Sequence, residues 1–220
     1  MTTGTMLVWS VAGLLAYLLG SVPFGFLMAK AHGKDIRTLG SGNIGATNVF
    51  RTIGKTQGII TFILDFLKGV AGVLLIPRLA LLLTGGDGAD AAFRYLPLFC
   101  GVLTVFGHNW TCFLGFKGGK GIATSAGMLM ALAPVAVGIA FAVWVVVFLS
   151  TRYVSVASIA AAVTLGIEVW ILPACVRQGL VLQVVLTALA VLAVVKHHAN
   201  IGRLIAGTES RFQFGKRKEP

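Results

Sequence analysis

Two segments of the chain combine glycine with basic and hydroxyl side chains: GSGNIGATNVFR at residues 40–51 and FKGGKG at residues 116–121. Glycine lets the backbone approach a ligand closely, and successive backbone N–H groups in such turns can form a concave cradle for an anion. Arginine and lysine beside them add full positive charges that pair well with phosphate. The two segments therefore predict binding of a phosphate-bearing molecule.

The first segment offers neutral donors together with one guanidinium group. Arg51 can bind a phosphate through two N–H groups. If residues 44–51 begin the second helix, the positive end of the helix dipole also favours an anion. The alternative is a plain turn-rich loop that precedes a membrane span. The candidate residues of this segment are Ser41, Gly42, Asn43, Gly45, Thr47, Asn48 and Arg51.

In the second segment Lys120 directly precedes a predicted helix, where an anion is again favoured. Gly118 and Gly119 are the residues that allow close backbone approach. Lys117 can alternatively be a cation that anchors the preceding span at the membrane interface. His108 lies inside an apolar stretch, where a buried neutral histidine is more common than a catalytic one.

Two further polar motifs follow, KHHANIGRLIAGTES at residues 196–210 and RYVSVASI at residues 152–159. His197 and Asn200 are three residues apart and share a helical face, so both are candidates for substrate contacts. Lys196 and Arg203 are interpreted as a basic cap of a terminal helix. Ser155, three residues before a second serine, is predicted to cap a helix or to line the site.

The elements that must position these residues are membrane helices. The chain has 220 residues, of which 57% are hydrophobic and 11% charged, and its mean hydropathy is +0.91; soluble domains have roughly 25% charged residues. Apolar runs recur that are long enough to cross a hydrocarbon core of about 30 Å. We predict an all-α polytopic membrane bundle in which residues 1–220 form one integral-membrane domain and residues 208–220 a basic cytoplasmic tail.

The predicted spans lie at residues 6–29, 57–83, 95–115, 154–173 and 179–196. Residues 122–150 are either one long tilted helix or two short ones. A hairpin that turns near Pro134 keeps Lys120 and Arg152 on the same side, and proline disfavours helical continuity there. With this hairpin the chain crosses the membrane about seven times, with its N-terminus outside and its C-terminus in the cytoplasm.

The net charge of +11 follows from the same topology. Most lysine and arginine residues then lie on the cytoplasmic side, as the positive-inside rule requires, and only Arg78, Arg94 and Arg177 lie outside. No basic stripe on a soluble face is present, so nucleic acid is not a predicted partner. Every polar motif falls on the cytoplasmic face.

The remaining buried polar residues and the cysteines predict no metal or redox centre. Cys100, Cys112 and Cys175 are odd in number and lack CxxC spacing, so they are interpreted as small core residues. Asp65 and Lys68, three residues apart, are predicted to neutralise each other within the second span. Glu168 has no assigned role. No metal and no cofactor are predicted.

Motifs that are absent narrow the chemistry. The sequence has no Gly-x-Ser-x-Gly arrangement for an acyl-enzyme and no Walker A motif for nucleotide hydrolysis. The His-x4-Asp pattern of soluble-facing glycerolipid acyltransferases is also missing, since His32 and Asp35 are only three apart.

Taken together, the four motifs resemble those of the bacterial acyl-phosphate:glycerol-3-phosphate acyltransferases. They are GSGNIGATNVFR, the run from His108 to Gly121, RYVSVAS and HHANIGRLIAGTE, and they occur in the same order. The resemblance spans essentially the whole chain. Thr111 is a departure, because members of the family often have proline there.

The resemblance implies a multi-pass enzyme of the bacterial inner membrane whose active site faces the cytoplasm. Such an enzyme transfers an acyl chain from acyl phosphate to the 1-hydroxyl of sn-glycerol 3-phosphate, which gives lysophosphatidic acid and phosphate. It needs membrane lipid around it and no cofactor, and the oligomeric state is not predicted. Carried over motif by motif, the site comprises Ser41, Thr47, Arg51, Lys120, Ser155, His197 and Asn200.

This chemistry suits the residues. Acyl phosphate is already activated, so the main task is to hold two anions together, which suits Arg51, Lys120 and backbone N–H groups. The proton of the glycerol hydroxyl passes either to His197 or to an oxygen of the acyl phosphate. The runner-up function is an anion transporter, but transporters bind near the midplane and often have inverted repeats, whereas these motifs gather at one surface. A structural scaffold would leave the glycine-rich basic loops unexplained.

Overall fold

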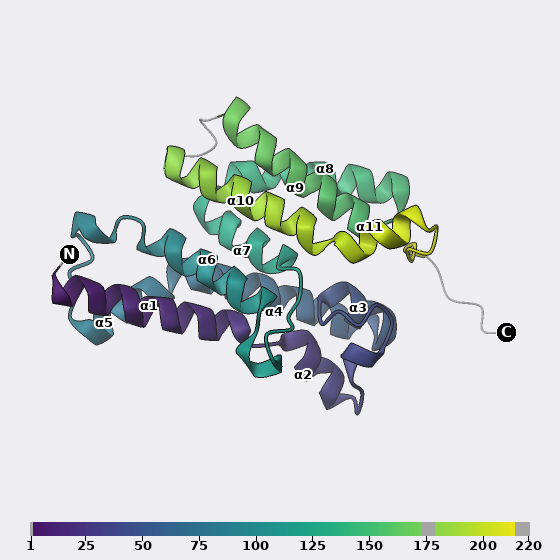
Figure 1. Ribbon diagram of the computed structural model, residues 1–220, viewed down its shortest axis with the longest axis horizontal. Coiled ribbons are helices and arrows are strands. Elements are labelled where there is room, and N and C mark those ends of the chain that lie inside the picture. Colours follow the sequence, from purple (N-terminus) through teal and green to yellow (C-terminus); the bar gives the residue numbers. More distant parts are fainter. Residues whose placement is uncertain (1, 173–178, 214–220) are drawn as a thin grey trace. The chain divides into compact units, whose positions relative to one another are not determined.

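The computed structural model describes residues 2–172 and 179–213, and all regular secondary structure within these ranges is helical (Figure 1). The all-α prediction is therefore confirmed. The chain divides into two compact units, Met1–Pro134 and Val135–Pro220. Each unit is described by itself.

The described part of unit 1 has seven helices and several short turns. They are α1 (Thr3–Ser21), α2 (Phe24–Ala31), α3 (Ala46–Thr52), α4 (Lys55–Leu74), α5 (Ile76–Thr84), α6 (Leu96–Asn109) and the shorter α7 (Ile122–Leu132), with 3-10 turns η1 (Ile36–Thr38), η2 (Ala91–Phe93) and η3 (Cys112–Leu114). Two predicted spans are broken: residues 6–29 at Val22 and Pro23, and residues 57–83 at Leu75. Proline explains both breaks, because it cannot donate a helical hydrogen bond and is tolerated only in the first turn, where Pro77 lies in α5.

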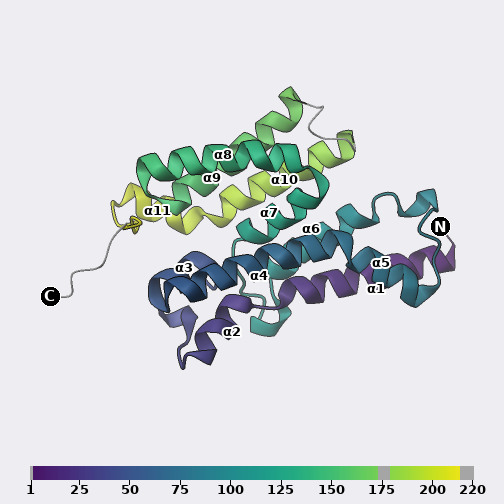
Figure 2. The ribbon, with the colours of Figure 1, turned by 180° about the vertical axis from the view of Figure 1, so that it is seen from behind.

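Glycines set the closest helix contacts in this unit. The helices α1 and α6 run side by side (Figure 1), and a Cβ added to Gly20 of α1 would overlap the carbonyl oxygen of Thr104 in α6. The helices α4 and α7 also pack along each other (Figure 2), and a Cβ on Gly69 or Gly127 would overlap backbone carbonyls of the facing helix. Membrane helices associate closely through such small residues, because lipid supplies no hydrophobic drive for helix pairing.

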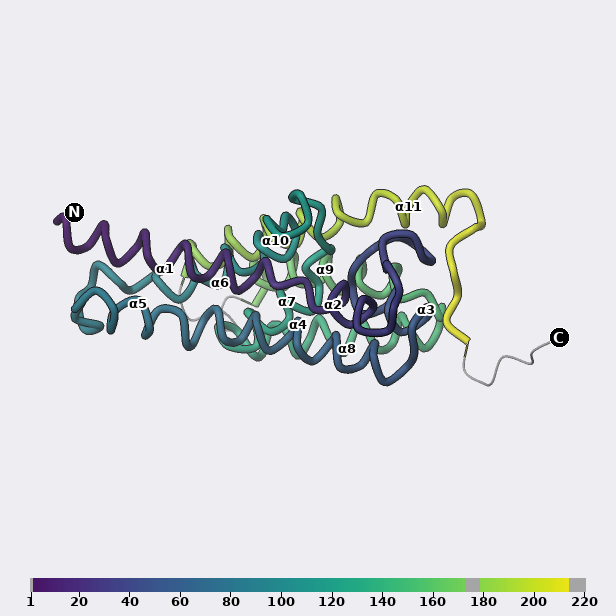
Figure 3. Tube along the Cα trace, turned by 90° about the horizontal axis from the view of Figure 1, so that it is seen from below, coloured from purple at the N-terminus to yellow at the C-terminus, as the bar shows by residue number. Residues whose placement is uncertain are grey.

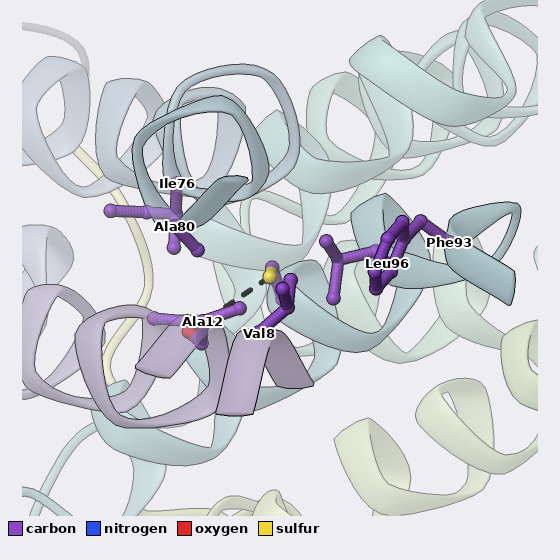
Figure 4. Packing of buried hydrophobic residues seen from close by; sticks show 8 residues of the cluster. Val8, Ala12, Ile76, Ala80, Phe93 and Leu96 are labelled. Atoms are coloured by element: carbon purple, nitrogen blue, oxygen red, sulfur yellow. Dashed lines mark hydrogen bonds between the residues drawn. The ribbon is translucent and has the colours of Figure 1, made fainter. Parts of the chain in front are cut away.

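A hydrophobic core lies where α1 meets α5 and α6 (Figure 4). Its buried residues are Val8, Ala12, Ala16, Ile76, Ala80, Phe93, Leu96 and Cys100. Cys100 is thus a core residue, as predicted, and its thiol faces the carbonyl oxygen of Ala12 at 3.9 Å. Cys175 lies outside the described residues.

The other end of unit 1, beyond the break that follows α1, contains α2, α3 and the loops between them (Figure 3). A second buried cluster of Ala29, Ile36, Ile44 and Val49 holds these loops, and Leu114 of η3 packs against it. This loop end therefore has its own small core, which is separate from the one in Figure 4.

Unit 2 is built from α8 (Pro134–Thr151), α9 (Val154–Ile171), α10 (Leu180–Lys196) and α11 (His198–Ile205). Polar side chains join its long helices: Trp144 Nε1 donates to Ser158 Oγ at 3.2 Å, and Gln183 Nε2 donates to the carbonyl oxygen of Val169 at 2.7 Å. The helices α10 and α11 meet at a bend of 48° at His197.

The first part of the predicted tail is folded onto unit 2. The backbone N–H of Phe212 donates to the carbonyl oxygen of Arg152 at 2.7 Å, and the Phe212 ring lies 5.3 Å from that of Phe148. Residues 208–213 therefore return to the turn between α8 and α9, while residues 214–220 lie outside the described part of the chain.

Within residues 2–172 and 179–213, five helices are long and apolar enough to cross a membrane, or six if α10 and α11 are one bent span. The helix break predicted at Pro134 is confirmed, and the alternative of one long helix over 122–150 is wrong. At 1.5 Å per residue the 11 residues of α7 extend about 16 Å, roughly half of a 30 Å core. Seven crossings and the orientation of the termini remain predictions.

Candidate functional site

The first glycine-rich segment is a loop followed by a short helix. The prediction that residues 44–51 begin the second span was wrong: Ala46–Thr52 forms the separate seven-residue helix α3, and the chain breaks at Ile53 and Gly54 before α4 begins. Arg51 thus lies in the last turn of α3 and not at the start of a long helix, so the predicted dipole does not act through it. Its side chain is exposed, and Thr47 is one turn earlier on the same face.

Asn48 organises this loop from inside. It is 5% exposed, and its amide Nδ2 donates to the carbonyl oxygens of Leu39 and Asn43, each at 2.9 Å. Its Oδ1 accepts from the backbone N–H of Ser41 at 3.1 Å. The Asn48 side chain therefore fixes where Ser41 lies, because one amide bridges three points of the loop.

Two other residues of the motif complete the turn. Asn43 Oδ1 accepts from the backbone N–H of Gly45 at 2.8 Å. Gly42 has a φ of 70°, which L side chains rarely adopt, so glycine is needed there. The result is a rigid loop that leaves the Ser41 side chain exposed to solvent.

The second glycine-rich segment packs directly against His108, near the C-terminal end of α6. The backbone N–H of Gly119 donates to the carbonyl oxygen of His108 at 3.0 Å. A Cβ on Gly118 would overlap that same oxygen, and one on Gly119 would overlap Nε2 of the imidazole. Lys120 is half-buried and directly precedes Gly121, the residue before α7, which has a φ of 79°. The prediction that Lys120 lies just ahead of a helix is confirmed.

The two loops belong to the same end of unit 1. Leu114, in the loop that leads to FKGGKG, packs against the cluster containing Ile44 and Val49 of the first motif. Thr111 Oγ1 donates to the carbonyl oxygen of Ser21 at 2.5 Å, which ties this loop to the end of α1. Arg51, at the end of α3, and Lys120, in the second loop, therefore belong to two segments that share a single support.

In unit 2 the predicted residues converge on a carboxylate that the sequence analysis did not select. Ser155 Oγ and Asn200 Nδ2 both donate to Oε1 of Glu209 at 2.7 Å, and Arg203 Nε donates to Oε2 at 2.7 Å. The Glu209 side chain is 5% exposed. Burial alone would raise the pKa of this carboxyl, but the hydrogen bonds from Asn200, Ser155 and Arg203 outweigh it and hold the pKa below the ordinary value of 4.5.

His197 lies at the bend between α10 and α11 and is 3% exposed. Its Nδ1 lies 2.7 Å from the carbonyl oxygen of Ala193. A carbonyl can only accept, so Nδ1 holds the proton, and in the neutral ring Nε2 is the nitrogen that can accept one. The helix bend thus fixes both the tautomer and the direction of the imidazole.

Comparison with known proteins gives the family. The family model described as glycerol-3-phosphate acyltransferase matches residues 10–207, which include the first three motifs, the fourth as far as Gly207, and nearly the whole chain. The chain belongs to the glycerol-3-phosphate acyltransferase family.

Relatives and solved structures agree with this assignment. A glycerol-3-phosphate acyltransferase of Desulforamulus reducens is 46% identical over 204 residues, which cover 92% of this chain and 94% of the relative. Two crystal structures of PlsY, an integral membrane glycerol 3-phosphate acyltransferase, are also similar. The glycerol 3-phosphate form has a TM-score of 0.76 and 40% identity, with 93% of this chain and 96% of that chain covered. The lysophosphatidic acid form has a TM-score of 0.73 and 39% identity, with 93% and 95% covered.

The structure groups the predicted residues within each unit. Ser41, Thr47, Arg51 and Lys120 lie on the loop end of unit 1, as described above, whereas Ser155 and Asn200 are joined in unit 2 through Glu209. The role of each residue in the family reaction remains a prediction.

Glu209 is the residue that sequence analysis missed. It is part of the quoted motif HHANIGRLIAGTE, but a lone glutamate beside a basic tail gave no sign of burial. The available signal was its spacing, since Arg203 and Asn200 precede it within the same motif. The structure shows the burial of Glu209 because the chain returns to Ser155, 54 residues earlier, which donates a hydrogen bond to the carboxylate.

Proposed function

We propose that this protein transfers an acyl chain from acyl phosphate to the 1-hydroxyl of sn-glycerol 3-phosphate and releases lysophosphatidic acid and inorganic phosphate. The observation that supports this best is the pair of glycine-rich segments, which share one apolar support and contain Arg51 and Lys120. Two cations in glycine-rich segments suit a reaction between two phosphate-bearing substrates. Membership of the family and the glycerol 3-phosphate form of the PlsY structure support the same acceptor.

The reaction needs no covalent enzyme intermediate. The glycerol hydroxyl oxygen attacks the acyl carbonyl, the new ester C–O bond forms, and the bond from the carbonyl carbon to the phosphate oxygen breaks. The phosphate departs with the electron pair of that bond. The hydroxyl proton passes to the departing phosphate, which is a base close to the reacting oxygen.

The residues of unit 1 serve the phosphate groups in this proposal. Lys120 and Ser41 hold the leaving phosphate, with the backbone N–H of Gly118 as a further donor, since the N–H of Gly119 is bonded to His108. Arg51 binds the phosphate of glycerol 3-phosphate through its planar fork, and Thr47 lies on the same helix face. Because both substrates are anions, these charges lower the cost of bringing them together.

The residues of unit 2 orient the acceptor. Asn200 and Ser155 are held by the buried Glu209 carboxylate, and His197 is held through its Nδ1. We assign His197 to substrate binding: its Nε2 accepts a hydrogen bond from the glycerol moiety while the acyl phosphate takes the proton. The alternative role, in which His197 is the general base, predicts that His197→Asn lowers turnover at saturating substrate and shifts the acidic limb of the pH–rate profile.

We further propose that the protein acts in the bacterial inner membrane with these loops facing the cytoplasm. The positive-inside rule supports this orientation, because the glycine-rich loops and the turn after α8 contain lysine and arginine whereas the turn after α5 contains acidic residues. Surrounding lipid then supplies the environment for the acyl chain, and no cofactor takes part.

The direct test uses purified protein in detergent or lipid with palmitoyl phosphate and radiolabelled glycerol 3-phosphate. We expect lysophosphatidic acid and phosphate in a one-to-one ratio, and a large decrease in both products, with measurable residual activity, in Lys120→Gln. Phosphate release without lysophosphatidic acid would reveal a hydrolase, and absence of both products with folded protein would contradict the proposal.

A further inference from the structure

Three buried titratable side chains in unit 1 have no role in the reaction described above. They are Asp65 and Lys68 of α4 and His108 of α6, with side chains 3%, 2% and 5% exposed. Ionisable groups inside a membrane protein are costly, and an ion pair is often no better than apolar packing of the same volume. Stability alone therefore gives a weak reason for this set.

The three side chains form one continuous contact. Lys68 Nζ lies 2.8 Å from Asp65 Oδ1, as the sequence spacing predicts, and donates to the carbonyl oxygen of Val22 at 2.9 Å. The same carboxylate oxygen lies 3.4 Å from Nδ1 of His108. Asp65 of α4 thus contacts the imidazole. Lys68 contacts both Asp65 and Val22, which lies in the break between α1 and α2.

The far side of His108 meets the FKGGKG loop. Nε2 of the imidazole occupies the space that a Cβ on Gly119 would need, and the carbonyl oxygen of His108 accepts from the N–H of Gly119. Both the ring and the backbone of His108 therefore touch the residue before Lys120. A movement of the ring changes the support of this peptide unit.

We propose that His108, oriented by the Asp65–Lys68 pair, is a positioning residue that sets where the Lys120 ammonium group lies. The inference rests on the proposed function for its effect on catalysis, because only then does the place of Lys120 matter to the rate. In this proposal the imidazole packs against Gly119 of the glycine-rich turn and acts through Lys120, without contacting substrate. Misplacing a catalytic group by about 1 Å can cost up to 100-fold in rate.

The kinetic test is a double-mutant cycle between His108 and Lys120. His108→Ala should lower kcat/KM at least tenfold in the otherwise unchanged protein, but much less in a Lys120→Gln background, because the residue it positions is already gone. Thr104→Val is the matched control: Thr104 is buried one turn earlier in α6 and bonds to Cys100 and Ala16, away from the loop. Its effect should be the same in both backgrounds. Equal losses from His108→Ala in both backgrounds would overturn the inference.

A second readout is independent of the reaction. A nitroxide label at position 117, which is exposed in the loop, should become more mobile in His108→Ala and stay unchanged in Thr104→Val. If His108→Ala does not fold, His108→Gln replaces it, with an expected smaller gain in mobility because the amide fills part of the space. An unchanged label in the folded variant would overturn the inference even if the acyltransferase activity is confirmed. A mobile label without any acyltransferase activity in the parent protein would instead refute the proposed function.

Discussion

At the scale of single residues, Arg51 allows the most specific prediction, because one substitution can keep its charge and change the shape of its side chain. Arg51→Lys keeps the charge and loses the planar fork, so activity should fall by about 30- to 1000-fold, which corresponds to roughly 2–4 kcal/mol of transition-state stabilisation. Steady-state rates at saturating acyl phosphate measure this. Arg78→Lys, an exposed change in α5 away from the loop end, is the control. Near-normal activity of Arg51→Lys would remove Arg51 from the site.

The buried Glu209 carboxylate leads to a prediction about stability at acidic pH. Its pKa is lowered, so its contacts contribute stability that is fully present above pH 4.5 and lost as the pH falls through the lowered value. Glu209→Gln removes the charge that Asn200, Ser155 and Arg203 share, which should cost about 1–3 kcal/mol and reduce activity at neutral pH. Thermal unfolding in detergent between pH 3 and pH 7 measures both effects. If the variant and the parent protein lose stability in parallel below pH 4.5, Glu209 does not account for the acid sensitivity.

These two residues also show what the sequence can predict at this scale. Arg51 stands inside a motif whose composition already indicates anion binding. Glu209 acquires its surroundings from Ser155, 54 residues away, and no local pattern reports such a contact. Asn48 is intermediate: its motif marked it as important, but only the structure shows its amide bonded to the loop backbone.

At the scale of elements, the short helix α7 begins two residues after Lys120, and glycines let this helix approach α4. Gly127→Ala should place a Cβ on the carbonyl oxygen of Phe66, cost about 1–3 kcal/mol by overpacking and lower activity by displacing the FKGGKG loop. Gly138→Ala is the matched control, since a Cβ on this α8 glycine meets nothing within 4 Å and alanine favours the helix by about 0.5–1 kcal/mol. Gly127→Ala should lower both the melting temperature and the activity, whereas Gly138→Ala should lower neither. Equal changes in the two variants would show that the close contact between α7 and α4 is unimportant.

The break at Pro134 leads to a prediction of topology. If residues 122–150 turn back, exposed positions 117 and 150 lie on the same cytoplasmic side. Single cysteines at these positions, in a variant without native cysteines, should both resist an impermeant thiol reagent applied to the outside of intact spheroplasts. Permeabilised cells provide the positive control. Labelling of one position and not the other would mean that the segment crosses the membrane once.

Hydrophobic runs located the helices well but not their interruptions. Runs at 6–29 and 57–83 are predominantly apolar, so composition could not show that each is two helices. Pro23 and Pro77 mark these two interruptions, whereas the sequence analysis predicts a helix break only at Pro134. The separate helix α3 could not be foreseen because no local pattern shows that Phe50 packs against Gly58 of α4 after the break at Ile53 and Gly54.

At the scale of the whole molecule, the residues that the four motifs predicted are divided between the two units, and each unit contains a different kind of group. Unit 1 supplies cations on glycine-rich loops, and unit 2 supplies a serine, an asparagine and a histidine held by buried partners. The described residues of both units contain the full set that the four sequence motifs predicted. The family could be inferred from those motifs because they are local, whereas the choice of acyl donor depends on chemistry that no fold comparison reports.

The identity of the acyl donor is accordingly the part of the proposed function to test first, and a comparison of two donors tests it. Initial rates of lysophosphatidic acid formation from glycerol 3-phosphate are measured with palmitoyl phosphate and with palmitoyl-CoA at equal concentrations, using the same purified protein. We predict turnover with palmitoyl phosphate and none with palmitoyl-CoA, because phosphate is the leaving group that we propose the Lys120 loop holds. Equal rates with the thioester would contradict the account.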